Sequence, residues 1–128
     1  MENSKHILVV DDDFDIVSII KISLQKSHFN VFAFTDPFLA LEHFELNSKN
    51  YGLVLSDVRM PGMPGFEFVR KVREIEPDVK ILLMSAFEIS DLEFSRALPS
   101  DTKIDGFVQK PVSPKELVRV IEETFREI

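Results

Sequence analysis

The chain has 128 residues, 45% hydrophobic and 29% charged, a balance that predicts one globular domain over residues 1–128 and excludes a disordered chain. A net charge of −7 without a cluster of Lys and Arg argues against direct binding of this domain to nucleic acid or an anionic membrane. The absence of cysteine excludes disulfides and thiol chemistry and favours a reducing, cytoplasmic location. The longest apolar stretches have four residues, far short of the roughly 20 of a membrane helix.

Short β-type runs alternate with longer amphipathic segments along the chain. In the first of these segments, Ile16, Ile20 and Leu24 recur every four residues, which is typical of one helix face. The segment 89–98 has an irregular apolar pattern, and an extended loop is expected over 99–104. In chain order, the expected strands and helices are His6–Val10, 14–26, Phe29–Phe34, 37–46, Gly52–Ser56, 65–75, Lys80–Ser85, 89–98, Gly106–Gln109 and 114–127.

Capping residues mark three of the helix starts. Asp36 and Ser113 each precede a proline, which is favoured at the first position of a helix. Asp13 is expected to cap the helix that begins at residue 14. These signals support helices directly after the first, second and fifth strands.

The regular alternation predicts the architecture. Strands joined by helices of this length form right-handed crossovers, which produce a parallel sheet with helices on both faces. The first, third and fourth strand runs are nearly all apolar, as burial on both faces requires. The expected fold class is therefore α/β, a doubly wound (βα)5 domain.

Polar residues stand where the expected strands end. Asp11 and Asp12 follow the first strand, Asp57 the third and Lys110 the fifth, while Ser85 ends the fourth. Open parallel α/β sheets bind ligands outside the carboxyl ends of their strands. Three acids, a hydroxyl and an amine are therefore expected to converge there.

Such an acidic cluster needs a cation. Two carboxylates about 4 Å apart repel by roughly 1 kcal/mol in water and about 4 kcal/mol near a protein surface. A site of carboxylate oxygens suits Mg²⁺, which keeps several waters and also binds phosphate oxygens. A carboxylate held beside the metal and an ammonium group can attack a phosphoryl group and form an aspartyl phosphate. The cluster therefore predicts Mg²⁺-assisted phosphoryl chemistry.

Each of these residues also has a purely structural interpretation. The acids after the first strand would cap a helix, Asp57 would begin a turn, Ser85 would be a strand-end hydroxyl, and Lys110 would be a solvated amine. Their joint placement at four strand ends favours a common site.

The stretches ILVVDDD, LVLSDVRMPGMPGFEF, ILLMSAF and GFVQKPVSPKEL resemble the receiver domains of two-component response regulators. The resemblance covers essentially the whole chain. It implies a flavodoxin-like fold with a five-stranded parallel sheet in the order 2-1-3-4-5. It also implies a signalling domain and no classical enzyme, although the domain would promote its own phosphotransfer and slow autodephosphorylation.

The resemblance assigns roles to the residues at the strand ends. Asp57 becomes the phosphoryl acceptor, and Asp12 a direct Mg²⁺ ligand together with Asp57 and the backbone carbonyl of Arg59. Asp11 would hold the metal mainly through water. Ser85 would bond a phosphoryl oxygen, and Lys110 would pair with the acceptor and then with the phosphoryl group.

Further implications concern conformational switching. Phe107 takes the switch position, usually Tyr or another aromatic residue, and would repack when Ser85 moves toward the phosphoryl group. The Lys110-Pro111 bond is commonly cis in the family. Pro64 stands where an acid is common. The interval of 25 residues from Ser85 to Lys110 is longer than usual, which leaves the shape of segment 89–98 open.

The expected partners are a sensor histidine kinase or phosphotransfer protein and a downstream target or output domain, with a phosphorylation-dependent homodimer also open. Whether the chain is a whole regulator or part of a longer one also stays open. One alternative is a receiver-like docking module that works without phosphorylation. Another is a haloacid-dehalogenase-type phosphatase, whose DxD motif Asp11 and Asp13 superficially offer. Flavin or nucleotide binding is disfavoured, because no glycine-rich phosphate loop follows the first strand.

Overall fold

The computed structural model describes residues 6–86 and 102–126. In that part of the chain, strands and helices alternate as expected. The elements are β1 (His6–Val10), α1 (Phe14–Lys26), β2 (Asn30–Phe34), α2 (Pro37–Asn47), the short 3-10 helix η1 (Ser48–Asn50), β3 (Tyr51–Asp57), α3 (Gly65–Ile75), β4 (Lys80–Ser85), β5 (Gly106–Gln109) and α5 (Pro114–Arg126).

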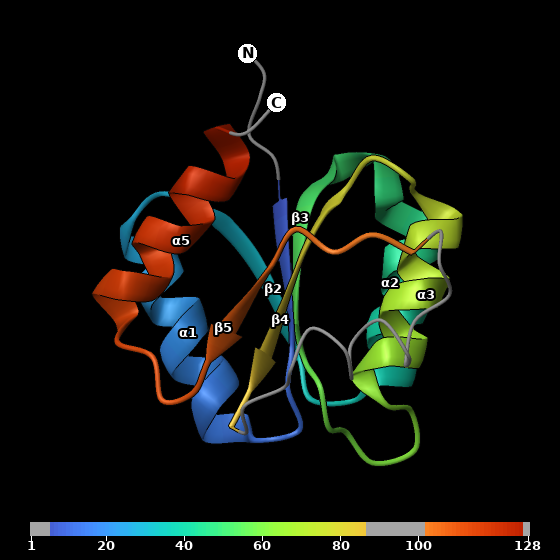
Figure 1. Cartoon of the computed structure of the whole chain (residues 1–128), viewed down its shortest axis with the longest axis horizontal. Helices are drawn as coiled ribbons and strands as arrows, with labels where there is room; N and C mark the ends of the chain where they lie inside the picture. Colours follow the sequence, from blue (N-terminus) through green and yellow to red (C-terminus); the bar gives the residue numbers. More distant parts are fainter. Residues whose placement is uncertain (1–5, 87–101, 127–128) are drawn as a thin grey trace.

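The five strands form one parallel sheet in the order β2-β1-β3-β4-β5. Helices α1 and α5 lie together on one face, and α2 and α3 lie together on the other (Figure 1). The predicted doubly wound fold and its strand order are therefore confirmed. All carboxyl ends of the strands point to the same edge, which is the lower edge in Figure 1.

Two hydrophobic clusters fill the space between the sheet and its helices. The cluster under α2 and α3 contains the fully buried Phe44 and Phe68. The cluster on the opposite face contains Leu24 and Ile121 of α1 and α5. Every residue of β3 is buried, because this central strand is covered on both faces. The buried central strand thus ends directly at Asp57.

The predicted helix caps are confirmed. The Asp13 carboxylate accepts hydrogen bonds from the backbone N–H groups of Asp15 at 2.9 Å and Ile16 at 3.3 Å. The Asp36 carboxylate accepts from the first turn of α2 at 2.8 Å, and the Ser113 hydroxyl accepts from the first turn of α5 at 3.1 Å. Each cap satisfies an N–H group that has no partner inside its helix.

Several element ends differ by a residue from the prediction. Strand β2 begins at Asn30 because the Phe29 N–H bonds the Leu24 carbonyl at 3.2 Å, directly after His28, whose φ is 70°. Strand β3 begins at Tyr51, which pairs with His6, and it includes Asp57. The expected helix 89–98 lies outside the described residues. No helix in the described ranges has the length and apolarity to cross a membrane.

Candidate functional site

Four charged side chains lie at the edge of the sheet formed by the carboxyl ends of its strands. Asp57 is the last residue of β3, Asp11 and Asp12 directly follow β1, and Lys110 directly follows β5. Strands β1 and β3 are hydrogen-bonded neighbours, so the three acids come from adjacent positions. The convergence of these four residues, predicted from their positions at the ends of parallel strands, is present in the structure.

The three carboxylates are close enough to share one ion. One oxygen from each of Asp11, Asp12 and Asp57 lies within 4.8 Å of the other two. Asp11 is 1% exposed and Asp57 is 7% exposed, whereas Asp12 is open to solvent. Buried carboxylates of like charge need compensation, and an all-oxygen donor set with one open side suits a hydrated dication. The residues present therefore fit Mg²⁺.

Lys110 supplies positive charge to two members of the cluster. Its Nζ donates to Asp11 Oδ2 at 2.5 Å and lies 3.1 Å from Asp57 Oδ1. Burial by itself would lower the pKa of Lys110, but the hydrogen bond and charge of Asp11, together with Asp57, raise it above its ordinary value. The ammonium group therefore stays charged and joins the two buried acids.

Asp57 lies in an environment that disfavours its charge. Burial raises the pKa of Asp57, and the neighbouring charge of Asp11 raises it further. The hydrogen bond and charge of Lys110 act in the opposite direction without cancelling this shift. Asp57 is thus a carboxylate whose negative charge the metal-free fold compensates incompletely.

Removal of the Asp57 charge is expected to stabilise the metal-free protein. Because the folded-state pKa of Asp57 is raised, its charge opposes folding above that pKa, and the penalty disappears as pH falls toward the unfolded value. In EDTA at pH 7, Asp57→Asn should raise the midpoint of thermal unfolding by about 3–5 °C, equivalent to about 1 kcal/mol. Calorimetry at pH 7 and pH 4 checks this, because the gain should shrink at pH 4. An unchanged or lower midpoint at pH 7 contradicts it.

Gly65 fixes the loop that follows Asp57. Its N–H donates to the Val58 carbonyl at 2.8 Å, so the chain folds back against the end of β3 at the start of α3. A Cβ atom at this position would lie 2.3 Å from the Asp57 carbonyl oxygen and 2.8 Å from the Val58 Cα. Gly65 was not predicted as a site residue, although Gly62 and Pro64 before it are typical turn residues.

Backbone hydrogen bonds align the ends of the strands around the site. The Val58 N–H donates to the Met84 carbonyl at 2.9 Å, and the Lys110 N–H donates to the Ser85 carbonyl at 2.7 Å. Ser85 is buried at the end of β4, and the Lys110-Pro111 bond is cis, as the family resemblance implied. These contacts place Ser85 at the same edge as Lys110.

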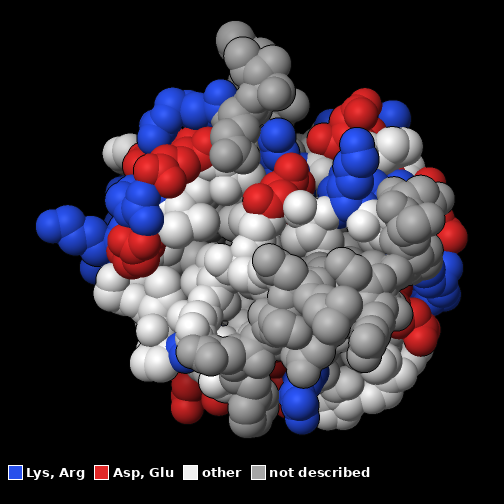
Figure 2. Space-filling model, viewed as in Figure 1, with Lys and Arg blue, Asp and Glu red and all other residues white. Residues whose placement is uncertain are grey.

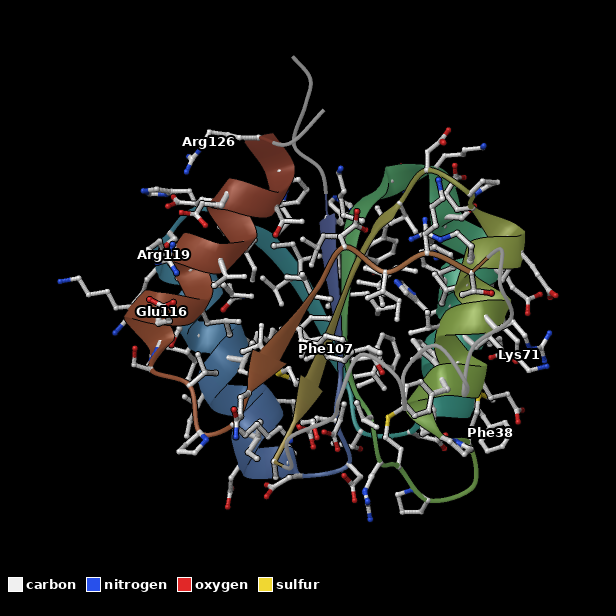
Figure 3. The ribbon with its side chains drawn as sticks, in the orientation of Figure 1. Phe38, Lys71, Phe107, Glu116, Arg119 and Arg126 are labelled. Carbon is white, nitrogen blue, oxygen red and sulfur yellow. The ribbon has the colours of Figure 1, made fainter. Side chains whose placement is uncertain are left out.

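The remaining predicted residues lie outside the acidic group of Asp11, Asp12 and Asp57. Arg59 is exposed and helps to line a hollow of about 610 Å³ that also includes Asp12 and Phe66. Phe107 lies on β5 with 41% of its surface exposed (Figure 3). Asp13 is not part of the acidic group, because its carboxylate caps α1.

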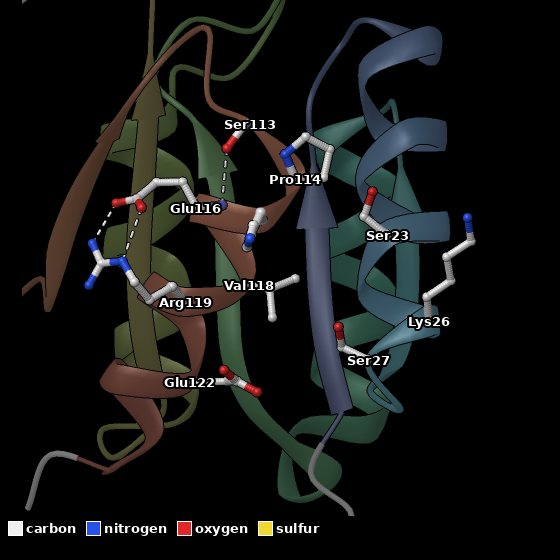
Figure 4. A pocket seen from close by; sticks show the side chains of 10 residues that line it. Ser23, Lys26, Ser27, Ser113, Pro114, Glu116, Val118, Arg119 and Glu122 are labelled. Atoms are coloured by element: carbon white, nitrogen blue, oxygen red, sulfur yellow. Dashed lines mark hydrogen bonds and ion pairs between the residues drawn. The ribbon is translucent and has the colours of Figure 1, made fainter.

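A second hollow lies between α1 and α5 (Figure 4). It measures about 730 Å³, and its lining includes Ser23, Ser113 and Arg119. Arg119 is engaged by Glu116 and Glu123 at 2.5 Å and 2.6 Å. Figure 2 likewise shows Lys and Arg beside Asp and Glu over α5, so this face carries mixed charge.

A sheet of order 2-1-3-4-5 covered by helices on both faces defines the flavodoxin-like class of α/β domains. Residues 7–122 match the family model described as the response regulator receiver domain. The chain is 33% identical over 119 residues to the response regulator receiver protein CpdR of Brucella abortus (strain 2308), covering 93% of this chain and 95% of that protein. The chain belongs to the response regulator receiver domain family.

Other relatives are longer than this chain. The alkaline phosphatase synthesis transcriptional regulatory protein PhoP of Bacillus subtilis (strain 168) is 32% identical over 114 residues, which cover 89% of this chain and 45% of that protein. Among solved structures, a CheY-like receiver domain protein from Methanospirillum hungatei JF-1 matches with a TM-score of 0.84 and 27% identity, covering 96% of this chain and 94% of that chain. The resemblance inferred from the sequence is confirmed at the level of family and fold.

Proposed function

We propose that this receiver domain accepts a phosphoryl group on Asp57 from a phosphohistidine of a sensor histidine kinase or phosphotransfer protein. The observation that carries the proposal is the convergence of Asp11, Asp12 and Asp57 within 4.8 Å, with Lys110 bonded to two of them. A carboxylate oxygen of Asp57 attacks the phosphorus, the bond to the donor nitrogen breaks, and the histidine leaves with its electron pair and gains a proton. The acceptor oxygen and the compensating charges lie at the same edge of the sheet, at the ends of three strands.

The acidic group would hold Mg²⁺ through Asp11, Asp12, Asp57 and the backbone carbonyl of Arg59. The metal would supply positive charge that offsets the charge on the phosphoryl oxygens. Lys110 would keep the Asp57 carboxylate oriented before transfer and then pair with the phosphoryl group. Its partial burial makes that interaction stronger than a surface ion pair.

Phosphorylation would act as a conformational switch. The Ser85 hydroxyl would bond a phosphoryl oxygen, and Phe107 would repack from its half-exposed position on β5. The changed surface would bind a downstream target or output domain, or a second copy of the chain. Residues 1–128 would act as one receiver unit that slowly dephosphorylates itself.

Mass spectrometry after incubation with acetyl phosphate and Mg²⁺ tests this function. The wild-type protein should gain roughly 80 Da, the mass of one phosphoryl group, and lose it in hydroxylamine. Asp57→Ala should gain nothing, because the acceptor oxygens are gone. Asp15→Asn, a change at an exposed acid of α1, serves as the matched control and should be phosphorylated like the wild type. Equal phosphorylation of Asp57→Ala would reject the acceptor assignment.

Two alternative functions, a docking module and a phosphatase, predict different experimental results. A docking module without phosphorylation would bind its partner equally well as wild type and as Asp57→Ala. A phosphatase of the haloacid-dehalogenase type would hydrolyse p-nitrophenyl phosphate and lose that activity in Asp11→Asn. The geometry argues against the phosphatase, because Asp13 caps α1 and so does not join Asp11 in a shared metal site.

A further inference from the structure

Arg73 of α3 makes a set of contacts far from the acidic cluster. Its Nη1 donates to the carbonyl oxygens of Pro77 at 2.7 Å and Val79 at 2.6 Å, and its Nη2 donates to the Lys103 carbonyl at 2.7 Å. Nη2 also lies 3.7 Å from Asp105 Oδ2. Arg73 therefore joins the end of α3, the turn before β4 and the stretch before β5.

This arrangement is specific to an arginine. The Arg73 side chain is only 15% exposed, and burial lowers its pKa, opposed by the charges of Asp105 and Asp78. A planar guanidinium can donate to three carbonyls in fixed directions, whereas a lysine ammonium is a compact point charge on a flexible stem. A surface ion pair holds only two side chains together. Arg73 is instead buried and bonded to three backbone carbonyls, so its contacts fix the positions of backbone segments.

Asp105 completes the attachment of the stretch before β5. Its carboxylate accepts a hydrogen bond from the Ile81 N–H at 2.7 Å, and its own N–H donates to the Ile81 carbonyl at 2.8 Å. Lys80 Nζ lies 3.8 Å from the same carboxylate. Ile104, between the two anchored residues, packs against the core under α3. In Figure 1 this stretch runs from the side of α3 across the beginning of β4 and into β5.

Strand β5 is short, so the contacts at its two ends contribute to its position beside β4. It has four residues, and in the described part of the chain it pairs with β4 at the edge of the sheet. Of these residues only Val108 is buried, so hydrophobic burial contributes little to its position. Its exit is held by the Lys110 N–H bond to Ser85, and its entry is held by Arg73 and Asp105.

We propose that Arg73 is a positioning residue that fixes the entry of β5 and thereby holds Lys110 against Asp11 and Asp57. The residue touches none of the reacting groups and acts through the strand. The inference rests on the proposed function, because the placement of Lys110 matters only if Asp57 is the acceptor. A displacement of about 1 Å at a catalytic position can slow a reaction by up to a hundredfold.

The test compares Arg73→Met with Arg70→Met. Arg70 lies on the same helix but pairs with the exposed Glu74, so its loss should leave β5 in place. Phe44→Leu, a core change beneath α2, provides a destabilised protein with β5 intact. Amide hydrogen exchange of Phe107 to Lys110 and the rate of phosphorylation by acetyl phosphate are measured for each folded variant.

In Arg73→Met, the β5 amides should exchange roughly tenfold faster than in the wild type when measured relative to the β1 amides. The variant should also be phosphorylated roughly tenfold more slowly than the wild type. Arg70→Met should match the wild type in both measurements, and Phe44→Leu should leave the exchange of β5 relative to β1 unchanged. If Arg73→Met does not fold, Arg73→Lys replaces it and should show smaller changes of the same kind. Either unchanged β5 exchange or unchanged phosphorylation per folded molecule would overturn the proposal.

The two proposals fail in different ways. If the wild-type protein takes no phosphoryl group, the proposed function fails, and the exchange of the β5 amides still decides whether Arg73 holds the strand. If the wild type is phosphorylated and Arg73→Met is phosphorylated at the same rate, only the positioning role fails.

Discussion

Lys110→Ala is expected to destabilise the metal-free protein by about 3 kcal/mol, the scale of removing one partner from a buried ion pair. The substitution leaves Asp11 and Asp57 buried without the ammonium that now lies 2.5 Å and 3.1 Å from their oxygens. It should also slow phosphorylation of Asp57 by about a hundredfold, as loss of a charge-stabilising donor does elsewhere. Urea unfolding in EDTA and the acetyl phosphate reaction measure the two effects.

A double-mutant cycle separates the causes of this loss. Asp57→Asn in the Lys110→Ala background should recover much of the stability, because one of the two uncompensated charges is then removed. Added Mg²⁺ should stabilise Lys110→Ala more than the wild type, since the metal replaces missing positive charge. Lys115→Ala, at an exposed lysine of α5, should change neither stability nor phosphorylation. A Lys110→Ala protein as stable as the wild type in EDTA would show that the ammonium does not compensate the acids.

Gly65→Ala is expected to cost about 2–4 kcal/mol, at the upper end of the penalty for overpacking. The added methyl group would meet the backbone of Asp57 and Val58 at 2.3 Å and 2.8 Å, and backbone atoms cannot turn away as a flexible side chain can. The end of β3 or the start of α3 must therefore shift. Because Asp57 is the residue contacted, Mg²⁺ affinity should also fall.

Thermal unfolding and Mg²⁺ titration by calorimetry check the Gly65 prediction. Gly106→Ala is the comparison, because its Cβ would lie 3.2 Å from a Leu82 side-chain atom, which has more freedom to move. Gly65→Ala should lose clearly more stability than Gly106→Ala. Equal losses, or full Mg²⁺ affinity in Gly65→Ala, would contradict the role assigned to this glycine.

Strand and helix positions were predictable because their signals are local. The four-residue spacing of Ile16, Ile20 and Leu24 and the capping side chains of Asp13 and Asp36 act within one element. The predicted bounds of an element were wrong where contacts with another segment of the chain decide where that element begins or ends. Tyr51 belongs to β3 because it pairs with His6 across the sheet, and a propensity pattern does not contain that pairing.

The site was predictable to the extent that it follows from the ends of parallel strands. Asp11, Asp12, Asp57 and Lys110 meet because the βα alternation aligns the carboxyl ends of β1, β3 and β5, so their positions in the chain were sufficient. Gly65 and Arg73 were missed, because their importance comes from a backbone approach and from three carbonyls brought together by folding.

The amino-acid sequence by itself determined the order of elements, the composition of the acidic site and the family resemblance, because periodicity, capping and strand-end chemistry are encoded over short distances. Only the tertiary structure decided how the charges are balanced. Lys110 lies 99 positions from Asp11 in the chain yet donates to it directly, and burial then raises the pKa of Asp57. Burial and distance between charges set that balance, and both exist only after the strands have packed side by side.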